Sequence, residues 1–151
     1  MHKLLIFFLL YNLLTAEVKL LEPRDKREEV LELAESLVDA PYRYGGKTPG
    51  GFDCSGFTNY VFQKAADIEL ARSSSSQARQ GDKVKLKKCK PGDLIFFSHR
   101  SKSIDHVGIV YKRLKGKLWM IHASSSNGVI IEEVLSSPYW SKRLVKLRSL
   151  F

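Results

Sequence analysis

The part of the chain that follows Gly92 constrains the fold most strongly. Short segments rich in β-branched and aromatic residues alternate there with turn residues, among them the pairs Lys115-Gly116 and Asn127-Gly128. Such pairs between apolar segments are typical of hairpin connections. We therefore expect antiparallel strands over residues 93–98, 105–112, 118–123, 129–134 and 144–150.

The preceding part of the chain has helical patterns. Residues 25–40 carry apolar side chains at the spacing of one helix face, namely Val30, Leu33, Ala34, Leu37 and Val38. Pro41 ends this segment, and after a glycine-rich loop a second helix is expected to begin near Cys54. A short helical piece is expected over residues 74–80. Helices followed by strands, in a chain of 151 residues, predict one α+β domain with its helices packed on a small antiparallel sheet.

The first residues have the features of a secretory signal peptide. A basic start precedes an almost wholly apolar run over residues 4–14, and Ala16 is a small residue at which cleavage is expected. The run is too short to span a bilayer comfortably. We therefore expect a signal peptide over residues 1–16, a domain over residues 17–151, and export to the periplasm, cell wall or exterior without a stable membrane anchor. A buried N-terminal helix is the alternative.

The chain is basic, with a formal net charge of +9. Basic surfaces attract polyanions, but no interleaving of aromatic and basic residues and no helix-turn-helix pattern supports nucleic-acid binding. Anionic wall polymers or phospholipid surfaces are the polyanions that an exported protein meets. The lysines are densest over residues 83–90, and over residues 83–87 they alternate with apolar residues as on a solvated strand edge.

The two cysteines are too few for a disulfide scaffold, and their surroundings differ. Cys89 lies in a lysine-rich loop, whereas Cys54 lies where the glycine-rich loop turns into a helix. The unpaired amides of a first helical turn stabilise a thiolate and can donate to an oxyanion. We therefore expect Cys54 to have a lowered pKa and to act as a nucleophile. The alternative is a buried structural cysteine.

A thiolate nucleophile needs a base, and histidine is the usual one. His106 and His122 lie in expected strands, whereas His99 lies in a polar loop. If the hairpin pairs Arg113 with Lys117, the two strand histidines share one face, with His122 opposite Gly108. His106 can then address Cys54 while His122 orients the His106 ring.

Each histidine alone could instead be a satisfied core residue. Zinc is the other rival, but close-spaced ligand pairs are absent, so no metal and no cofactor are expected.

Six segments of the chain form an ordered set of motifs. Five read Pro-Tyr-Arg-Tyr-Gly-Gly over residues 41–46, Gly-Phe-Asp-Cys-Ser-Gly-Phe over 51–57, Lys-Pro-Gly-Asp-Leu-Ile-Phe-Phe over 90–97, Asp-His-Val-Gly-Ile-Val over 105–110 and Ile-His-Ala over 121–123. The remaining one is Arg72-Ser73-Ser74 with Gln77 and Gly81. These segments resemble, in the same order, the sequence blocks of the NlpC/P60 family of cysteine peptidases. The resemblance covers roughly residues 28–135. One block alone is weak, but the ordered set is specific.

The resemblance implies a papain-like fold and hydrolysis of peptidoglycan stem peptides between γ-linked D-glutamate and a diamino acid. Carried over, Cys54 is the nucleophile, His106 the base and His122 the orienting residue. Tyr42 matches a tyrosine near the nucleophile that helps the oxyanion hole.

Asp53 and Ser55 match positions that line the substrate groove. Tyr42 and Asp53 also have possible structural roles: Tyr42 can be a packing residue and Asp53 a helix cap. The rival functions are a papain-like amidase or acyltransferase and a non-catalytic wall-binding protein. We expect a monomer.

Overall fold

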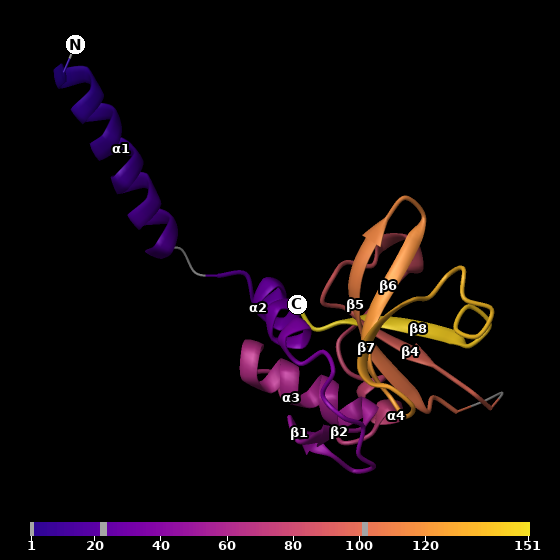
Figure 1. Cartoon of the computed structure of the whole chain (residues 1–151). Helices are drawn as coiled ribbons and strands as arrows, with labels where there is room; N and C mark the ends of the chain where they lie inside the picture. Colours follow the sequence, from indigo (N-terminus) through magenta and orange to yellow (C-terminus); the bar gives the residue numbers. More distant parts are fainter. Residues whose placement is uncertain (1, 22–23, 101–102) are drawn as a thin grey trace.

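A computed structural model describes residues 2–21, 24–100 and 103–151 (Figure 1). The helices are α1 (His2–Leu21), α2 (Lys26–Ser36), α3 (Cys54–Ala66) and α4 (Ser74–Gln77), with a 3-10 turn η1 (Leu86–Lys88). The strands are β1 (Lys47–Thr48), β2 (Gly51–Phe52), β3 (Asp82–Val84), β4 (Leu94–Phe97), β5 (His106–Leu114), β6 (Lys117–Ser124), β7 (Gly128–Glu133) and β8 (Leu144–Ser149).

The main sheet has six strands in the order β3-β8-β4-β5-β6-β7, and each neighbouring pair in it is antiparallel. Helices α2 and α3 pack on one of its faces (Figure 1). The prediction of an α+β domain with helices on an antiparallel sheet is therefore confirmed, as are the expected strands. The first helix of the domain is shorter than predicted, because it ends at Ser36 and not near Ala40, and the piece expected over residues 74–80 ends at Gln77.

The core lies on both faces of the sheet. On the helix side, Phe57 and Phe62 of α3 pack with Phe96 of β4 and Ile109 of β5, all fully buried. Burying an aromatic or large aliphatic side chain contributes about 1.5–3 kcal/mol, so this layer fixes α3 against the sheet. The opposite face carries a second cluster, in which Cys89 is 5% exposed. Cys89 is thus a buried core residue.

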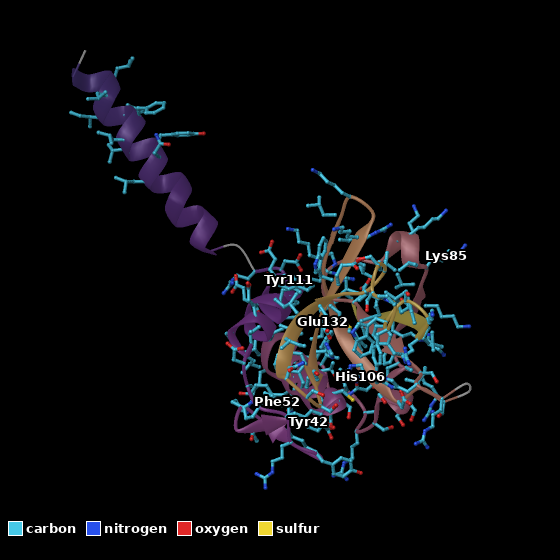
Figure 2. All side chains as sticks on the ribbon, turned by 45° about the vertical axis from the view of Figure 1, so that its right-hand side comes forward. Tyr42, Phe52, Lys85, His106, Tyr111 and Glu132 are labelled. Carbon is cyan, nitrogen blue, oxygen red and sulfur yellow. The ribbon has the colours of Figure 1, made fainter. Side chains whose placement is uncertain are left out.

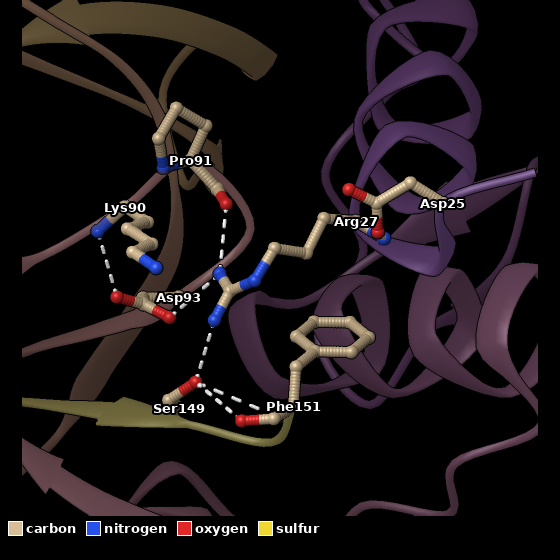
Figure 3. Close-up of polar contacts among 7 residues, drawn as sticks. All are labelled: Asp25, Arg27, Lys90, Pro91, Asp93, Ser149 and Phe151. Atoms are coloured by element: carbon tan, nitrogen blue, oxygen red, sulfur yellow. Dashed lines mark hydrogen bonds and ion pairs between the residues drawn. The ribbon is translucent and has the colours of Figure 1, made fainter.

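Arg27 of α2 joins the helix layer to the sheet (Figure 3). Its guanidinium donates to the carboxylate of Asp93 at 2.8 Å and to the hydroxyl of Ser149 at 2.7 Å, and it lies 4.7 Å from the ring centroid of Phe151. Asp93 is 1% exposed, and its other oxygen accepts from the amide of Lys90 at 2.8 Å. Because the carboxylate is buried, its pairing with Arg27 is a condition for stable packing of α2.

The β5–β6 hairpin has a register that differs from the predicted one near its turn. Leu114 pairs with Lys117, and Arg113 pairs with Leu118 and not with Lys117. Lys115 and Gly116 form a two-residue connection in which both φ angles are positive, at 50° and 76°. These angles fit a type I′ turn, which matches the twist of the adjoining strands. The prediction of the Arg113–Lys117 pair was therefore wrong by one position.

A bulge in β5 restores the predicted register farther along. The pairing shifts between Val110 and Lys112, and beyond the shift Ile109 pairs with Ile121. A bulge inserts one extra residue on one strand, so it offsets the error at the turn. His122 consequently lies beside Gly108, as the sequence predicted, since a Cβ built on Gly108 would lie 3.2 Å from that of His122.

The lysine-rich segment is only partly an edge strand. β3 lies at one edge of the sheet and includes Lys83, but it ends at Val84. Leu86 and Lys87 lie in the 3-10 turn η1, so the strand edge expected over residues 83–87 is present only as far as Val84.

Helix α1 carries exposed apolar side chains, with Leu4, Phe7 and Phe8 at 82%, 78% and 70% exposure. None of the helices over the described residues combines the length and apolar character needed to cross a membrane. α1 continues to Leu21, past the cleavage site expected after Ala16. The side chains of His2, Lys3 and Ala16, on which the signal-peptide prediction draws, lie outside those described.

Candidate active site

Cys54 is the first residue of α3, as the sequence predicted. Asp53 caps this helix, because one carboxylate oxygen accepts from the amide of Gly56 at 2.7 Å and the other from the amide of Gly45 at 3.0 Å. The glycine-rich loop passes very close to the helix start, so that a Cβ on Gly56 would lie 2.0 Å from the carbonyl oxygen of Gly46. The capped loop therefore fixes the direction in which the helix presents its cysteine.

The thiol of Cys54 lies against the beginning of β5. Its sulfur is 4.0 Å from the carbonyl oxygen of Asp105, the residue before His106. Burial raises the pKa of this thiol, while backbone amides, above all that of Val107, lower it in part. The prediction that its pKa is lowered was therefore wrong for the free protein: the helix start does favour the thiolate, but loss of water around the sulfur outweighs it.

His106 and His122 share one face of the sheet and contact each other. Nε2 of His106 lies 2.8 Å from Nδ1 of His122, and the rings are almost perpendicular at 88°. His106 is 9% exposed and His122 is fully buried. Burial lowers the pKa of His106 well below its usual value, with His122 and His99 lowering it further. At neutral pH the free protein thus holds an uncharged imidazole near an uncharged thiol.

Glu132 and Trp140 complete the surroundings of the histidine pair, and sequence reasoning missed both. A carboxylate oxygen of Glu132 lies 2.7 Å from Nε2 of His122 and accepts from the indole of Trp140 at 3.1 Å. The Trp140 ring stacks on His106, with centroids 5.1 Å apart and 25° between the planes. Only the β6–β7 register, which pairs His122 with Ile130, places Glu132 diagonally next to this histidine.

These groups line one open cavity of about 500 Å³. Three residues of its wall, Tyr42, His106 and Glu132, are labelled in Figure 2. Its walls include the residues Tyr42, Cys54, His99, His106, His122, Glu132 and Trp140. The structure therefore brings Cys54, His106 and His122 to the same cavity, although they come from three separate elements. A cavity of this size admits a short peptide segment.

Tyr42 fits both readings that the sequence left open. It is partly buried against the helix-side core, and it also lines the cavity with Cys54. Burial raises the pKa of its hydroxyl, and the charges of Cys54 and Asp53 raise it further. The hydroxyl therefore stays protonated at neutral pH and can donate a hydrogen bond.

Asp53 and Ser55 do not line the cavity that contains Cys54. They line a separate, smaller hollow of about 100 Å³, together with Arg72. The Ser55 hydroxyl lies 3.4 Å from Asp53, and the reading of Asp53 as a helix cap is confirmed.

His99 lies at the cavity wall although it belongs to a polar loop. Its Nδ1 contacts the carboxylate of Asp105 at 2.7 Å, and its ring centroid is 6.1 Å from that of His106. Ser101 and Lys102 of the same loop lie outside the described residues. In the described part of the chain, no three potential ligands among His, Cys, Asp and Glu are arranged to hold a metal ion.

Comparison with known proteins identifies relatives of the chain. It is 40% identical over 129 residues to Gamma-DL-glutamyl hydrolase of Bacillus subtilis, covering 84% of this chain and 30% of that protein. It is 36% identical over 124 residues to murein DD-endopeptidase MepS/murein LD-carboxypeptidase of Escherichia coli, covering 82% and 63%. The chain thus spans less than two thirds of the length of these relatives.

Solved structures and a family model agree with these relatives. An NlpC/P60 family protein from Bacillus cereus superposes with a TM-score of 0.74 at 29% identity, covering 84% of this chain and 41% of that one. RipD of Mycobacterium tuberculosis, described as a non-catalytic NlpC/p60 domain protein, shares the fold with a TM-score of 0.66 at 22% identity, covering 85% of this chain and 100% of that one. Residues 39–149 match the model of the NlpC/P60 family, and the chain belongs to that family.

Proposed function

We propose that the chain is a cysteine peptidase that hydrolyses peptidoglycan stem peptides. The observation that carries this proposal is the meeting of Cys54, His106 and His122 at one open cavity. A nucleophile, a base within reach of it and a residue that orients the base are the parts that acyl transfer requires. The names of the relatives, which are hydrolases and endopeptidases of peptidoglycan or glutamyl peptides, support the same reaction.

The reaction begins from the uncharged pair. His106 takes the thiol proton of Cys54 as the sulfur attacks the scissile carbonyl, so a carbon–sulfur bond forms while the imidazole becomes cationic. The amides of Cys54 and Ser55, which already lie beside the sulfur, donate to the oxyanion, and the Tyr42 hydroxyl is a further donor at the same cavity.

The second half of the reaction returns the enzyme to its starting state. His106 gives its proton to the departing amine as the carbon–nitrogen bond breaks, which leaves a thioester on Cys54. It then takes a proton from water, whose oxygen attacks the thioester. The thiolate leaves and regains the proton, so no metal or cofactor enters the balance.

The scissile bond that we propose joins γ-linked D-glutamate to a diamino acid. The Bacillus subtilis relative is named for γ-glutamyl hydrolysis, whereas the Escherichia coli relative is named for DD- and LD-bonds. The hollow with Asp53, Ser55 and Arg72 holds charges of both signs close to the nucleophile. Such a hollow suits the charged groups of a stem peptide.

We also propose that residues 1–16 are a signal peptide and that the mature domain acts outside the cytoplasm. The helix that carries the apolar run has exposed side chains from Leu4 to Leu13, whereas α2 contributes buried residues to the core. Expression of the full chain in a bacterium, followed by mass measurement of the exported protein, tests this. A mature N-terminus near residue 17 supports it, and an uncleaved chain retained inside the cell contradicts it.

Digestion of defined muropeptides, analysed by mass spectrometry, tests the peptidase. One fragment that ends in D-glutamate and another that begins with the diamino acid support the proposed bond. Fragments produced by cleavage of a DD-bond would show that the enzyme cuts that bond instead. Lipid esters in a parallel incubation test the acyltransferase alternative. No turnover of any substrate, with tight binding to peptidoglycan, would instead support a wall-binding protein.

A further inference from the structure

Glu132 ends a chain of hydrogen bonds that leads to the proposed base. The links are Nε2 of His106 to Nδ1 of His122 at 2.8 Å, and Nε2 of His122 to Oε2 of Glu132 at 2.7 Å. The three side chains come from β5, β6 and β7, which are neighbours in the sheet. Glu132 has no role in the sequence predictions or in the proposed mechanism. Its contact with His122 is nevertheless as short as the contact between the two histidines.

The contact between Trp140 and Glu132 sets the donor and the acceptor in each of these hydrogen bonds. Its indole N–H donates at 3.1 Å to the same Oε2 atom that contacts His122. A carboxylate oxygen only accepts, so His122 must carry its proton on Nε2. A neutral His122 then accepts at Nδ1 from the Nε2 proton of His106, and this leaves Nδ1 of a neutral His106 with the lone pair that a base needs.

We propose that Glu132 is a positioning residue of the reaction: it sets the tautomer of both histidines and offsets the positive charge that forms on them when the thiol is deprotonated. This inference rests on the proposed peptidase function. It assigns to Glu132 the part that a carboxylate plays behind the histidine of a serine protease triad, with one additional imidazole in between.

The charge part of the role follows from the burial of the pair. With His106 only 9% exposed and His122 fully buried, an imidazolium formed there has little water around it. A buried cation requires a counter-charge. The hydrogen bond from His122 is the main cause that holds the pKa of Glu132 below its usual range, so this carboxylate is ionised at neutral pH.

Two substitutions separate the charge of Glu132 from its hydrogen bond. In Glu132→Gln the Trp140 N–H selects the amide oxygen at that place, so the acceptor stays while the charge is lost. In Glu132→Met both are lost at a similar side-chain length. Glu69→Gln removes the same charge from an exposed residue of the α3–α4 connection and is the matched control.

The measurements are kcat and KM on a muropeptide and the ¹⁵N NMR shifts of the imidazole nitrogens. The wild type should show His122 protonated on Nε2. Glu132→Met should lose this signature and reduce kcat by about 10- to 100-fold with KM nearly unchanged, which is the size of loss known for residues that orient a metal-bound histidine. Glu132→Gln should keep the signature and lose less kcat, and Glu69→Gln should match the wild type.

The outcomes distinguish this inference from the function on which it rests. A wild-type His122 protonated on Nδ1, or a wild-type kcat in both Glu132 variants while Cys54→Ala is inactive, overturns the role of Glu132 alone. If Glu132→Met fails to fold, the His122 tautomer in the wild-type NMR spectrum and the kcat of Glu132→Gln still test the role of Glu132. If Cys54→Ala is as active as the wild type, the proposed peptidase mechanism fails whatever the Glu132 variants do.

Discussion

Gly108 lies directly against the side chain of His122. A Cβ built on this glycine would be 3.2 Å from the His122 Cβ and equally close to the Met120 sulfur and the Ile121 carbonyl oxygen. Gly108 is also two residues from His106 on the same face of β5, so any displacement at this point moves one histidine relative to the other.

Gly108→Ala should therefore lower stability and activity together. The added methyl group overpacks the hairpin, which costs about 1–3 kcal/mol of unfolding free energy, and a small shift of the histidine pair should lower kcat at least about tenfold. Urea unfolding and muropeptide kinetics measure the two effects. Gly50→Ala is the control, because its Cβ would meet its nearest neighbour at 3.7 Å. A fully active, equally stable Gly108→Ala protein would show that the close contact does not matter.

The reactivity of Cys54 should show that its thiol and the His106 imidazole are both uncharged in the free protein. Because burial raises the thiol pKa and lowers that of His106, iodoacetamide should alkylate the free protein slowly at pH 6, and the rate should rise with a midpoint above about 8.5. A Cys89→Ala background isolates the signal of Cys54, read by mass spectrometry. A rate that reaches its plateau below pH 7 would instead indicate a preformed thiolate–imidazolium pair.

The pH profile of hydrolysis provides an independent check of the same pair. His106 must be neutral to accept the proton, and its pKa is lowered, so the acid limb of kcat/KM should lie below about 6.5.

Tyr42→Phe should affect the reaction and not the fold. Loss of one oxyanion donor should reduce kcat by about 10²-fold, with KM changed little. Tyr44→Phe is the matched control, since Tyr44 is 93% exposed. Equal kinetics of the two variants would leave Tyr42 as a packing residue only.

Arg27→Met should destabilise the domain, because it leaves the buried Asp93 carboxylate without its positively charged partner. A loss of about 3–5 kcal/mol is expected in urea unfolding. Lys26→Met, which breaks an exposed ion pair with Glu29, should cost less than about 1 kcal/mol. Adding Asp93→Asn to Arg27→Met should recover part of the loss, and a double variant no better than the single one would contradict the explanation.

The sequence was sufficient to predict helices α2 and α3, strands β4 to β8 and the three residues that meet at the cavity. Alternating segments and turn pairs located the strands of the β4–β8 region, and the loop-to-helix boundary located Cys54. These features are local, and local patterns report which segments are helices or strands.

Registers depend on turn and bulge geometry, which local patterns do not report. The shared face of His106 and His122 was predicted from a pairing at the hairpin turn that the structure does not have. The bulge in β5 shifts the register by one residue, so the two histidines still lie on the same face. Glu132 was missed because the β6–β7 connection pairs Ser124 with Gly128, whereas the predicted turn at Asn127-Gly128 implies another register. The pKa of the Cys54 thiol depends most on its burial in the folded protein. The position of Cys54 at a helix start does not predict that burial.

The rate of muropeptide cleavage by Cys54→Ala, compared with that of the wild type, decides whether Cys54 is the nucleophile. We expect no cleavage above background by the variant, with an unchanged circular dichroism spectrum and melting temperature, because the sulfur that forms the thioester is missing. Cleavage by Cys54→Ala at the wild-type rate would contradict this expectation.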